Sequence, residues 1–410
     1  MTISMRAAML AVACMPFAAQ AAPLSLDDAL GRALAFSPQN EVARARDSGL
    51  SASRRAADTR PLATIDAQSE NLGVGGRDLR DQMQFDVAYT QRIERGGKRA
   101  ARLAFVDREL DVSRAEAVVA RLEVAAQTQK LYIEAQSASV ALGAARDRLA
   151  LARTVAQEVG RRVTAARDPL FAGTRARTQL VEAEVELEVA THERDRCIAR
   201  LVALWAGSVD GIEIPTTDFL ELVHVEQDHP PSPPDLAVYQ ARSAQAEASI
   251  ALERAQAVPD PSVMVGPRYL VGSGDIALIA GVSMPLSNRH LNRANIDRAE
   301  AGRRQAEANL AVERFQRSRE IDTAAEEVEE AKHAAESIRD RVLPGLRQTL
   351  AEVRAGYARG GFAFLDVSSA STALAEATSR MIAAATRFHL AQVRLDRLTG
   401  HFADIAREAR

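Results

Sequence analysis

The feature that most restricts the fold of this chain is a pair of long helical stretches, which run from Lys98 to about Arg167 and from Arg289 to about Ala358. Each carries helical patterning over about 70 residues with few breakers, Pro344 being the main exception. At about 1.5 Å per residue each stretch would extend on the order of 100 Å, which no compact domain of this size accommodates. Long helices packed side by side through Ala-rich seams do accommodate it, and a sustained near-heptad pattern favours supercoiling.

Composition also favours long helices over a compact core. Hydrophobic residues make up 47% of the 410 residues and charged residues 26%, but only 4% are aromatic. Such a composition, with mostly Ala, Leu and Val as its aliphatic residues, is typical of closely packed long helices. The formal net charge of −3 does not indicate a nucleic-acid partner or an anionic surface.

The chain contains an internal repeat with a spacing of about 190 to 200 residues, far longer than a solenoid period. Arg60-Pro61 corresponds to Asp260-Pro261, and in both a helical stretch ends where an alternating one begins. Further matches share one offset: Lys98, Arg102, Glu109, Ala115 and Glu116 correspond to Arg289, Arg293, Glu300, Ala306 and Glu307. We therefore expect one repeat over residues 23–210 and a second over 235–400, with a Pro-rich linker at 211–234 and a tail at 401–410.

Within each repeat the pattern predicts a helix, two strands, a very long helix, a turn and another long helix. In the first repeat these are a short opening helix capped by Ser25 and Asp28, a helix at 39–58, strands at 62–72 and 83–94, and helices at 98–167 and 174–206. In the second, a helix precedes a β-hairpin at 261–286 and helices at 289–358 and 364–399. The turns between the long helices are expected to be the tips of helical hairpins.

The predicted strands are apolar on one face. Phe85, Val87 and Tyr89 alternate with polar or small residues, and Ile276, Leu278 and Val282 do the same in the second hairpin. Each strand has about 10 residues, which matches the tilted span of a bilayer core. Two hairpins packed on a soluble core have the same periodicity, so both interpretations remain open at this point.

The first 22 residues are expected to be a cleaved secretory signal. Arg6 precedes an apolar run, and Ala19-Gln20-Ala21 forms a small-residue cleavage site. The alternatives are a buried N-terminal helix and lipidation of Cys14, for which Ala11 stands where such a site usually has Leu. After cleavage at Ala21 or Ala22, Cys197 is the single remaining cysteine, so no intramolecular disulfide forms.

No later stretch reaches the roughly 18 uncharged apolar residues that a membrane-spanning helix requires. An exported chain of this kind therefore stays soluble in the periplasm or enters the outer membrane as strands.

Five sequence features, in their order along the chain and together with the internal repeat, resemble the TolC-like outer-membrane efflux proteins. Among these the resemblance is to the shorter CzcC-type members that serve metal-cation exporters. The resemblance covers nearly the whole mature chain. The features are Leu24-Ser25-Leu26-Asp27-Asp28-Ala29-Leu30 with Ser37-Pro38, Arg92-Ile93-Glu94-Arg95-Gly96-Gly97-Lys98-Arg99, Pro259-Asp260-Pro261, Leu343-Pro344, and Tyr357-Ala358-Arg359-Gly360.

The resemblance implies a mainly α fold with a small β part. Each protomer gives four strands and a set of long helices, and three protomers close one transmembrane β-barrel and one coiled-coil helical barrel in the periplasm. It further implies a cell outer-membrane location, a periplasmic adaptor, an inner-membrane RND-type pump and contact with outer-membrane lipid. Physical chemistry agrees, because four strands with open edges in lipid leave backbone groups unpaired, whereas three sets of four close into an even-numbered barrel.

Three groups of residues are functional candidates under this interpretation. Asp366 resembles the first of two acidic positions near the family's channel entrance, while the second position is Ser369 here; a cap of the returning helix explains Asp366 equally well. The residues expected to meet the adaptor at the hairpin tips are Pro169, Leu170, Ala172, Gly173, Gly360, Gly361 and Phe362. The strand residues expected to contact lipid are Phe85, Val87, Tyr89, Ile276, Leu278 and Val282.

No motif indicates catalysis, a cofactor or nucleotide binding. Gly96-Gly97-Lys98 resembles the end of a phosphate-binding loop, but Arg92 stands where that loop requires glycine. The linker residues His224, Glu226, Asp228 and His229 are a metal-ligand set or simply a solvated loop. We therefore expect a passive exit duct, with metal cations as cargo or small organic compounds as the alternative, and a periplasmic coiled-coil adaptor as the competing function.

Overall fold

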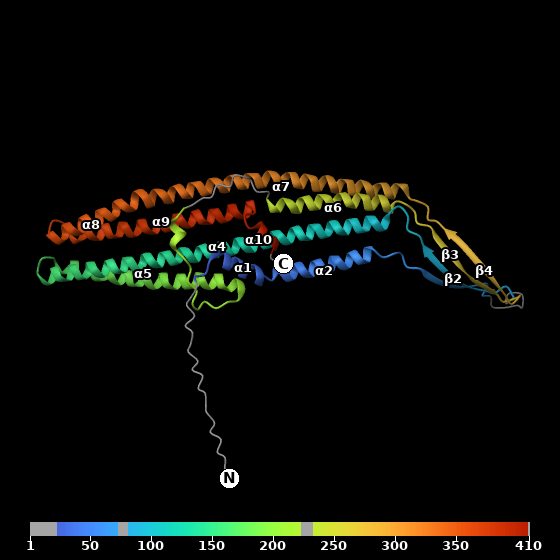
Figure 1. Ribbon diagram of the computed structural model, residues 1–410, viewed down its shortest axis with the longest axis horizontal. Helices are drawn as coiled ribbons and strands as arrows, with labels where there is room; N and C mark the ends of the chain where they lie inside the picture. The colour runs from blue at the N-terminus through green and yellow to red at the C-terminus, as the bar shows by residue number, and fades with distance from the viewer. Residues whose placement is uncertain (1–22, 73–80, 223–232, 409–410) are drawn as a thin grey trace, which may run out of the picture. The chain divides into compact units, whose positions relative to one another are not determined.

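The computed structural model describes residues 23–72, 81–222 and 233–408. Within them the protein is mainly helical with one small antiparallel sheet, which confirms the predicted fold class (Figure 1). The chain forms two compact units. The first comprises Met1–Leu30, Leu131–Leu222 and Asp340–Ala383, and the second comprises Gly31–Lys130, Val223–Arg339 and Ala384–Arg410. Each unit thus combines segments from both sequence halves.

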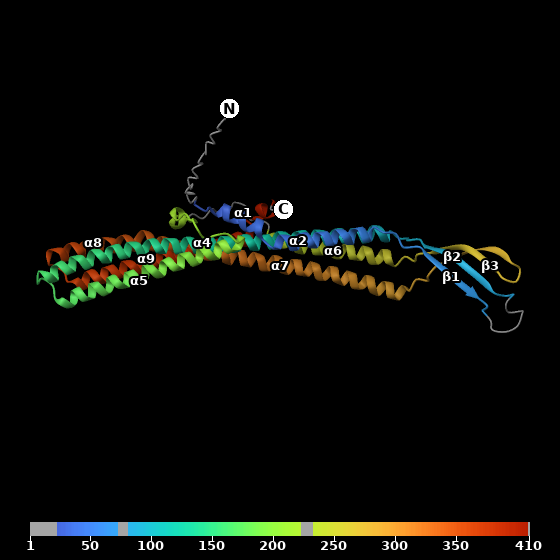
Figure 2. The same ribbon diagram turned by 90° about the horizontal axis from the view of Figure 1, so that it is seen from below.

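Four helices run side by side in the first unit, as the two ribbon views agree (Figures 1 and 2). They are α5 (Leu170–Val202), α8 (Leu343–Arg359) and the parts of α4 (Lys98–Thr164) and α9 (Phe364–Thr399) that belong to this unit. One buried cluster joins all four helices: Val155, Val159, Ala172, Ala176, Tyr357, Phe364 and Val367. Because α5 contributes only alanines to this cluster, its backbone can approach its neighbours closely.

The N-terminal segment of the first unit is fixed by polar contacts. The Ser25 hydroxyl accepts the Asp28 backbone N–H at 3.1 Å at the start of α1 (Leu26–Phe36), which is the cap expected from the sequence. The Leu24 backbone N–H donates to the Glu213 carbonyl at 2.8 Å, and the Tyr132 hydroxyl donates to the Leu24 carbonyl at 3.0 Å.

Part of the predicted linker at 211–234 belongs to this packed structure. A short 3₁₀ helix, η2 (Thr217–Leu220), buries Phe219 completely. The predicted tail at 401–410 is also partly helical, as α10 (Ala403–Glu408) in the second unit. Neither segment is fully solvated, and the reason is the same in both. Phe219 in the linker and Phe402 and Ala406 in the tail are buried, so they gain apolar contacts that a solvated segment lacks.

The second unit contains α2 (Gln39–Ala57), α6 (Pro234–Gln256), α7 (Arg289–Ser337) and the sheet. Its strands are β1 (Thr64–Glu70), β2 (Gln84–Arg92), β3 (Ser262–Leu270) and β4 (Asp275–Ser283), all antiparallel in the order β1-β2-β3-β4. The pairing of β2 with β3 joins the two predicted hairpins into one sheet. The strands are a few residues shorter than the predicted segments.

The predicted second long helix is not continuous. Helix α7 ends at Ser337, a π-helical turn η3 (Ile338–Val342) follows, and α8 begins at Leu343 with Pro344 in its first turn. Proline has no backbone N–H to donate, so the helical hydrogen-bond ladder cannot pass through this point unchanged. The corresponding stretch of the first half lacks a proline and forms the uninterrupted 67-residue helix α4.

Helix α5 begins at Leu170, four residues before the predicted start. Pro169 has extended backbone angles (φ −71°, ψ 151°) as the N-cap, so the helix starts immediately after it and includes Gly173. The helix ends at Val202 and a 3₁₀ turn, η1 (Ala203–Trp205), follows.

None of the described helices combines the length and the apolar character needed to cross a membrane. The predicted signal segment 1–22 with Cys14, the strand-connecting loop residues 73–80, and the linker residues His224, Glu226, Asp228 and His229 lie outside the described residues.

Candidate functional site

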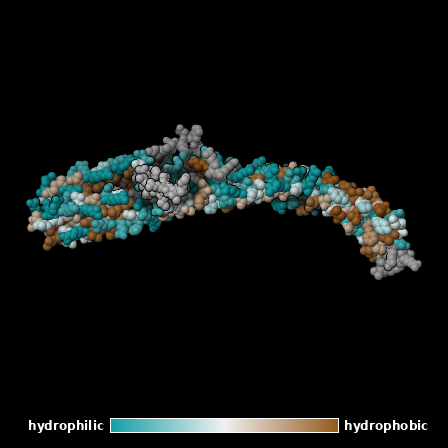
Figure 3. Space-filling model, turned by 60° about the horizontal axis from the view of Figure 1, so that its bottom comes forward, coloured by the Kyte–Doolittle hydropathy of each residue, from teal (hydrophilic) through white to brown (hydrophobic). Residues whose placement is uncertain are grey.

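One face of the four-stranded sheet is apolar on all four strands. Directly paired residues of an antiparallel sheet lie on the same face, and Tyr89 pairs with both Ile65 and Val265. The six predicted lipid-facing residues all lie on this face and are each at least 41% exposed: Phe85, Val87, Tyr89, Ile276, Leu278 and Val282. Figure 3 shows the resulting hydrophobic surface over the sheet. An exposed apolar face of this extent indicates an apolar partner.

The opposite face of the sheet is polar and hydrogen-bonded. Arg268 forms a two-point ion pair with Asp86, at 2.8 Å and 2.6 Å. On the neighbouring strand Asp66 accepts hydrogen bonds from Thr90 at 2.9 Å and Thr64 at 3.2 Å. A sheet with these two faces suits a boundary between an apolar medium and water.

Both outer strands of the sheet have a free edge. Within the described residues β1 pairs only with β2, and β4 pairs only with β3. Their outward peptide groups are therefore available for pairing with another sheet edge. An isolated sheet with an apolar face and two open edges is incomplete as a membrane structure.

The first hairpin tip, between α4 and α5, exposes two large apolar side chains. Leu170 is 82% exposed and Phe171 is 70% exposed, and Pro169 beside them is also exposed. Ala172 and Gly173 differ from the expectation of a contact surface, since both are buried within the helical hairpin. Gly173 faces Val163, where an added Cβ would lie 3.5 Å from its side chain. The surface that a partner can reach at this tip therefore includes Pro169, Leu170 and Phe171.

A partly buried polar cluster ties this tip to the end of α8. The Arg162 guanidinium donates to the Asp168 carboxylate at 2.9 Å and to the Tyr357 carbonyl at 3.0 Å. The Tyr357 hydroxyl donates to the same carboxylate, and the Arg162 guanidinium lies 4.5 Å from the centre of the Tyr357 ring. Three residues from segments about 190 positions apart thus hold the two hairpins together.

The charge state of this cluster is set by its contacts. Burial alone would raise the pKa of Asp168, but the hydrogen bonds from Arg162 and Tyr357 outweigh it and lower the pKa below the ordinary 3.8. Burial, and then the hydrogen bond to Asp168, raises the pKa of the Tyr357 hydroxyl. At neutral pH the carboxylate is therefore ionised and the phenol is protonated, which is the state that both hydrogen bonds require.

The second hairpin tip is a tight turn built on glycine. Gly360 has a left-handed backbone (φ 87°), and the Gly361 N–H donates to the Gly356 carbonyl at 2.9 Å. The Phe362 ring packs on Gly356, where an added Cβ would lie 2.1 Å from that ring. Phe362 remains 50% exposed, so this tip also presents an apolar side chain.

Asp366 and Ser369 lie on the first turns of α9 and are both exposed. The Asp366 carboxylate accepts the Ala363 backbone N–H at 2.9 Å. Ser369 lies on the same helix three residues further on. The structure thus gives Asp366 a helix-capping contact. Its role at a channel entrance stays a prediction.

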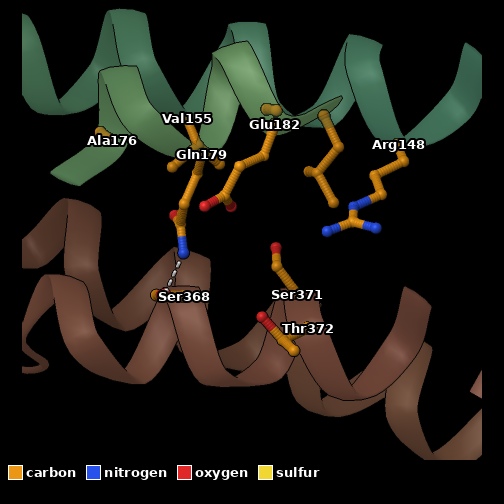
Figure 4. Close-up of a pocket in the computed structure, with 10 residues that line it drawn as sticks. Arg148, Val155, Ala176, Gln179, Glu182, Ser368, Ser371 and Thr372 are labelled. Atoms are coloured by element: carbon orange, nitrogen blue, oxygen red, sulfur yellow. Dashed lines mark hydrogen bonds between the residues drawn. The ribbon is translucent and has the colours of Figure 1, made fainter. Parts of the chain in front are cut away.

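A small cavity of about 60 Å³ separates α5 from α9 within the first unit (Figure 4). Its wall is mixed. The Gln179 amide donates to the Ser368 hydroxyl, Glu182 and Arg148 also line the space, and Leu151, Val155 and other apolar residues form the rest of the wall. Arg148 also forms an ion pair with Glu186. The cavity is thus small, and one side-chain hydrogen bond, between Gln179 and Ser368, crosses it.

The described residues contain no group of three or more His, Cys, Asp or Glu side chains placed to hold a metal ion. Cys197 is buried, and its thiol donates to the Glu193 carboxylate at 3.4 Å. Burial and the adjacent Glu193 carboxylate raise the pKa of this thiol to about 11, which keeps it protonated and unreactive.

Sequence reasoning missed the polar cluster of Arg162, Asp168 and Tyr357. Its signals were present in Arg167-Asp168-Pro169 and in Tyr357-Ala358-Arg359-Gly360, but each was interpreted only as a turn or a family feature. The ion pair of Asp86 and Arg268 was missed for the same reason, since it joins two different hairpins.

The chain is similar to known proteins in sequence and in fold. The family described as outer membrane efflux protein matches residues 232–401. The cobalt-zinc-cadmium resistance protein CzcC of Cupriavidus metallidurans is 26% identical over 318 residues, covering 75% of each chain. The nickel-cobalt-cadmium resistance protein NccC of Alcaligenes xylosoxydans xylosoxydans is 29% identical over 314 residues, covering 73% of this chain and 68% of that one.

Among solved structures, the outer membrane protein VceC of Vibrio cholerae has a similar fold. The TM-score is 0.71 at 19% identity, and the similarity covers 92% of this chain and 96% of that one.

Proposed function

Because this chain belongs to the outer membrane efflux protein family, we propose that it is the outer-membrane exit duct of a tripartite efflux system. The duct passively conducts cargo to the exterior of the cell from an inner-membrane RND-type pump and a periplasmic adaptor. Energy and substrate choice belong to the pump, so the chain itself acts as a conduit and not as an enzyme.

The observation that carries this proposal is the one-sided sheet with two open edges. Its apolar face is suited to lipid and its polar face to water, while β1 and β4 each have one edge that pairs with no strand in the part of the chain that the structure describes. Three such sheets joined edge to edge close a barrel in which the backbone groups of every edge strand are hydrogen-bonded, which a single protomer cannot achieve. We therefore propose a homotrimer, built from two TolC-like repeats per protomer.

Metal cations are the proposed cargo. The sequence relatives are named for resistance to cobalt, zinc, cadmium and nickel. The polar face of the sheet supports a cationic cargo, because it carries four carboxylates against two guanidinium groups, which leaves an excess of negative charge. These residues are Asp66, Glu70, Asp86 and Asp275 against Arg92 and Arg268.

The hairpin tips are the proposed contact with the periplasmic adaptor. Leu170, Phe171 and Phe362 are large apolar side chains exposed at the two helical turns. Exposed apolar groups of this kind on rigid helical hairpins are suited to packing against another helical protein.

Deleting the gene and restoring it on a plasmid tests the function. The deletion strain should become sensitive to cobalt, zinc or cadmium salts, and the purified protein should migrate as a heat-modifiable trimer and form conducting channels in planar bilayers. Sensitivity only to dyes or detergents would assign a small organic cargo instead. Recovery of the protein in the soluble osmotic-shock fraction, with no channels formed, would contradict the duct and favour a periplasmic adaptor.

A further inference from the structure

The junction between sheet and helices in the second unit contains a groove of about 730 Å³. Its walls are the end of α2, the end of β2 and the first turn of α4, and charged side chains from all three line it. The charged residues are Asp58, Arg60, Arg92, Glu94, Lys98 and Arg99. Four cations against two carboxylates leave the groove with an excess of two positive charges.

The acidic groups of this junction are already paired. Asp58 forms an ion pair with Arg99 at 2.7 Å, and Glu94 is held by the Arg102 guanidinium. Lys98 contacts Asp260 at 2.7 Å, so its charge is also neutralised. By contrast Arg60 and Arg92, both exposed, form no ion pair with any residue that the structure describes. The positive excess of the groove therefore resides on these two side chains. Arg92 belongs to the polar face of β2, so Arg60, which lies outside the strands, is the cation that can serve a ligand on the apolar side.

The groove is continuous with the apolar face of the sheet. The Tyr89 hydroxyl on that face donates to the Gln91 side chain at 3.2 Å, and Gln91 in turn donates to the Pro61 carbonyl at 3.1 Å in the wall of the groove. Ile93, which is 47% exposed, lines the groove, and Leu62, which follows the groove residue Pro61 in the sequence, is 89% exposed. Figure 3 shows hydrophobic surface continuing from the sheet onto this junction.

We propose that this groove binds the phosphodiester headgroup of an anionic phospholipid whose acyl chains lie along the apolar face of the sheet. A guanidinium group beside an apolar surface is the arrangement that satisfies both parts of such a lipid, since the phosphate meets the cation while the chains leave water. The inference rests on the proposed outer-membrane function, because it assigns the apolar face to lipid.

The excess positive charge favours an anionic over a zwitterionic headgroup. The phosphate of phosphatidylglycerol is not balanced by a cation of its own, whereas that of phosphatidylcholine is. Each unpaired arginine near a headgroup contributes a preference of about fivefold for the anionic lipid. Arg60 is the better probe of the two, because it lies outside the strands and makes no described hydrogen bond or ion pair whose loss would disturb the fold.

Native mass spectrometry of the full-length protein in an equimolar micellar mixture of phosphatidylglycerol and phosphatidylcholine tests the proposal. The wild type should retain phosphatidylglycerol by about fivefold or more over phosphatidylcholine. Arg60→Gln should bring this ratio close to one, whereas Arg92→Gln, on the polar face of β2, should leave it largely unchanged. The matched control is Arg175→Gln on α5, which removes one exposed arginine charge from the first unit and should leave the ratio unchanged.

Three outcomes would overturn the proposal. The first is a wild type without the preference, and the second is an Arg60→Gln variant that keeps it. The third is glycerol 3-phosphate competing as strongly as the intact lipid, which would indicate a site for soluble phosphates. Insertion into pure phosphatidylcholine vesicles and single-channel conductance are measured in parallel. Channels formed there without any lipid preference would leave the duct function standing and remove only the headgroup site, whereas no insertion in either lipid would contradict the duct itself.

Discussion

The Asp366 carboxylate accepts a hydrogen bond of 2.9 Å from the backbone N–H of Ala363. Ala363 immediately precedes α9, so the carboxylate reaches back from the third helical residue to the start of its own helix. This is the acidic half of a capping box, and it satisfies a backbone donor that the helix cannot satisfy itself. The carboxylate remains exposed, so its negative charge is also available to ions.

Substitution of Asp366 separates capping from charge. Asp366→Asn keeps an oxygen that can accept the Ala363 N–H but removes the charge, so trimer yield should stay normal while cation over anion selectivity in planar bilayers falls, most clearly at low salt. Asp366→Ala removes both and should additionally destabilise the tip by about 0.5 to 2 kcal/mol. Unchanged selectivity in Asp366→Asn, together with a destabilised Asp366→Ala, would limit this residue to capping.

Removing the Tyr357 hydroxyl should loosen the first hairpin tip. In Tyr357→Phe the Asp168 carboxylate loses one of its two donors while the ring keeps its packing, and the expected cost is about 1 to 3 kcal/mol of unfolding free energy. Limited proteolysis between α4 and α5 should accelerate relative to the wild type. Tyr239→Phe on α6 is the control, because it removes a phenolic hydroxyl for which the structure gives no hydrogen bond. Equal proteolysis of both variants would contradict the assigned hydrogen bond.

Acidification should weaken the same tip. The folded-state pKa of Asp168 is lowered below the ordinary 3.8, so its contribution to stability is complete above the ordinary value and is lost as the pH falls toward the folded-state value. Thermal unfolding of the wild type and of Asp168→Asn should therefore differ at pH 7, and the difference should shrink as the pH falls below 3.8. A difference that stays constant over this range would show that ionisation of Asp168 does not stabilise the fold.

Arginine at Leu278 should impair membrane insertion. Leu278 is 76% exposed on the apolar face of β4, where a guanidinium near the bilayer midplane costs roughly 2 to 4 kcal/mol. The amount of heat-modifiable trimer in the outer-membrane fraction should fall. Gln68→Arg places the same side chain on the polar face of β1 and should insert normally. Equal yields of the two variants would contradict the assignment of the apolar face to lipid.

The sheet shows which features a sequence makes predictable. Alternation placed Phe85, Val87 and Tyr89 on one face, and the observed register agrees because a period of two is a local property of the chain. Gly266 in β3 was not singled out, although an added Cβ there would lie 2.0 Å from the Val87 carbonyl oxygen. That requirement arises only when β2 and β3 pair, across a separation of more than 170 residues.

The hairpin tips show the same limit. Proline and glycine residues in the sequence located both turns. A glycine, however, lies in the turn only where no neighbouring residue, such as a proline, already sets the start of the helix. Pro169 starts α5 earlier than Gly173 suggested, and Gly173 is then buried inside the helix. The cluster of Arg162, Asp168 and Tyr357 depends on side chains that meet only after four helices pack, so no local pattern encodes it.

Cysteine crosslinking at the hairpin tips tests the contact with the adaptor. Leu170→Cys and Phe362→Cys replace side chains that are 82% and 50% exposed, so both should crosslink in cells to a helical adaptor that packs on the tips. Ala172→Cys is the matched control, because Ala172 is only 3% exposed and its side chain points into the core of the hairpin. The native Cys197 is 5% exposed and should contribute little background. Crosslinks that form equally well from Ala172→Cys would show that the tip opens on assembly. Crosslinks that form only from positions near the sheet would refute the placement of the adaptor at the tips.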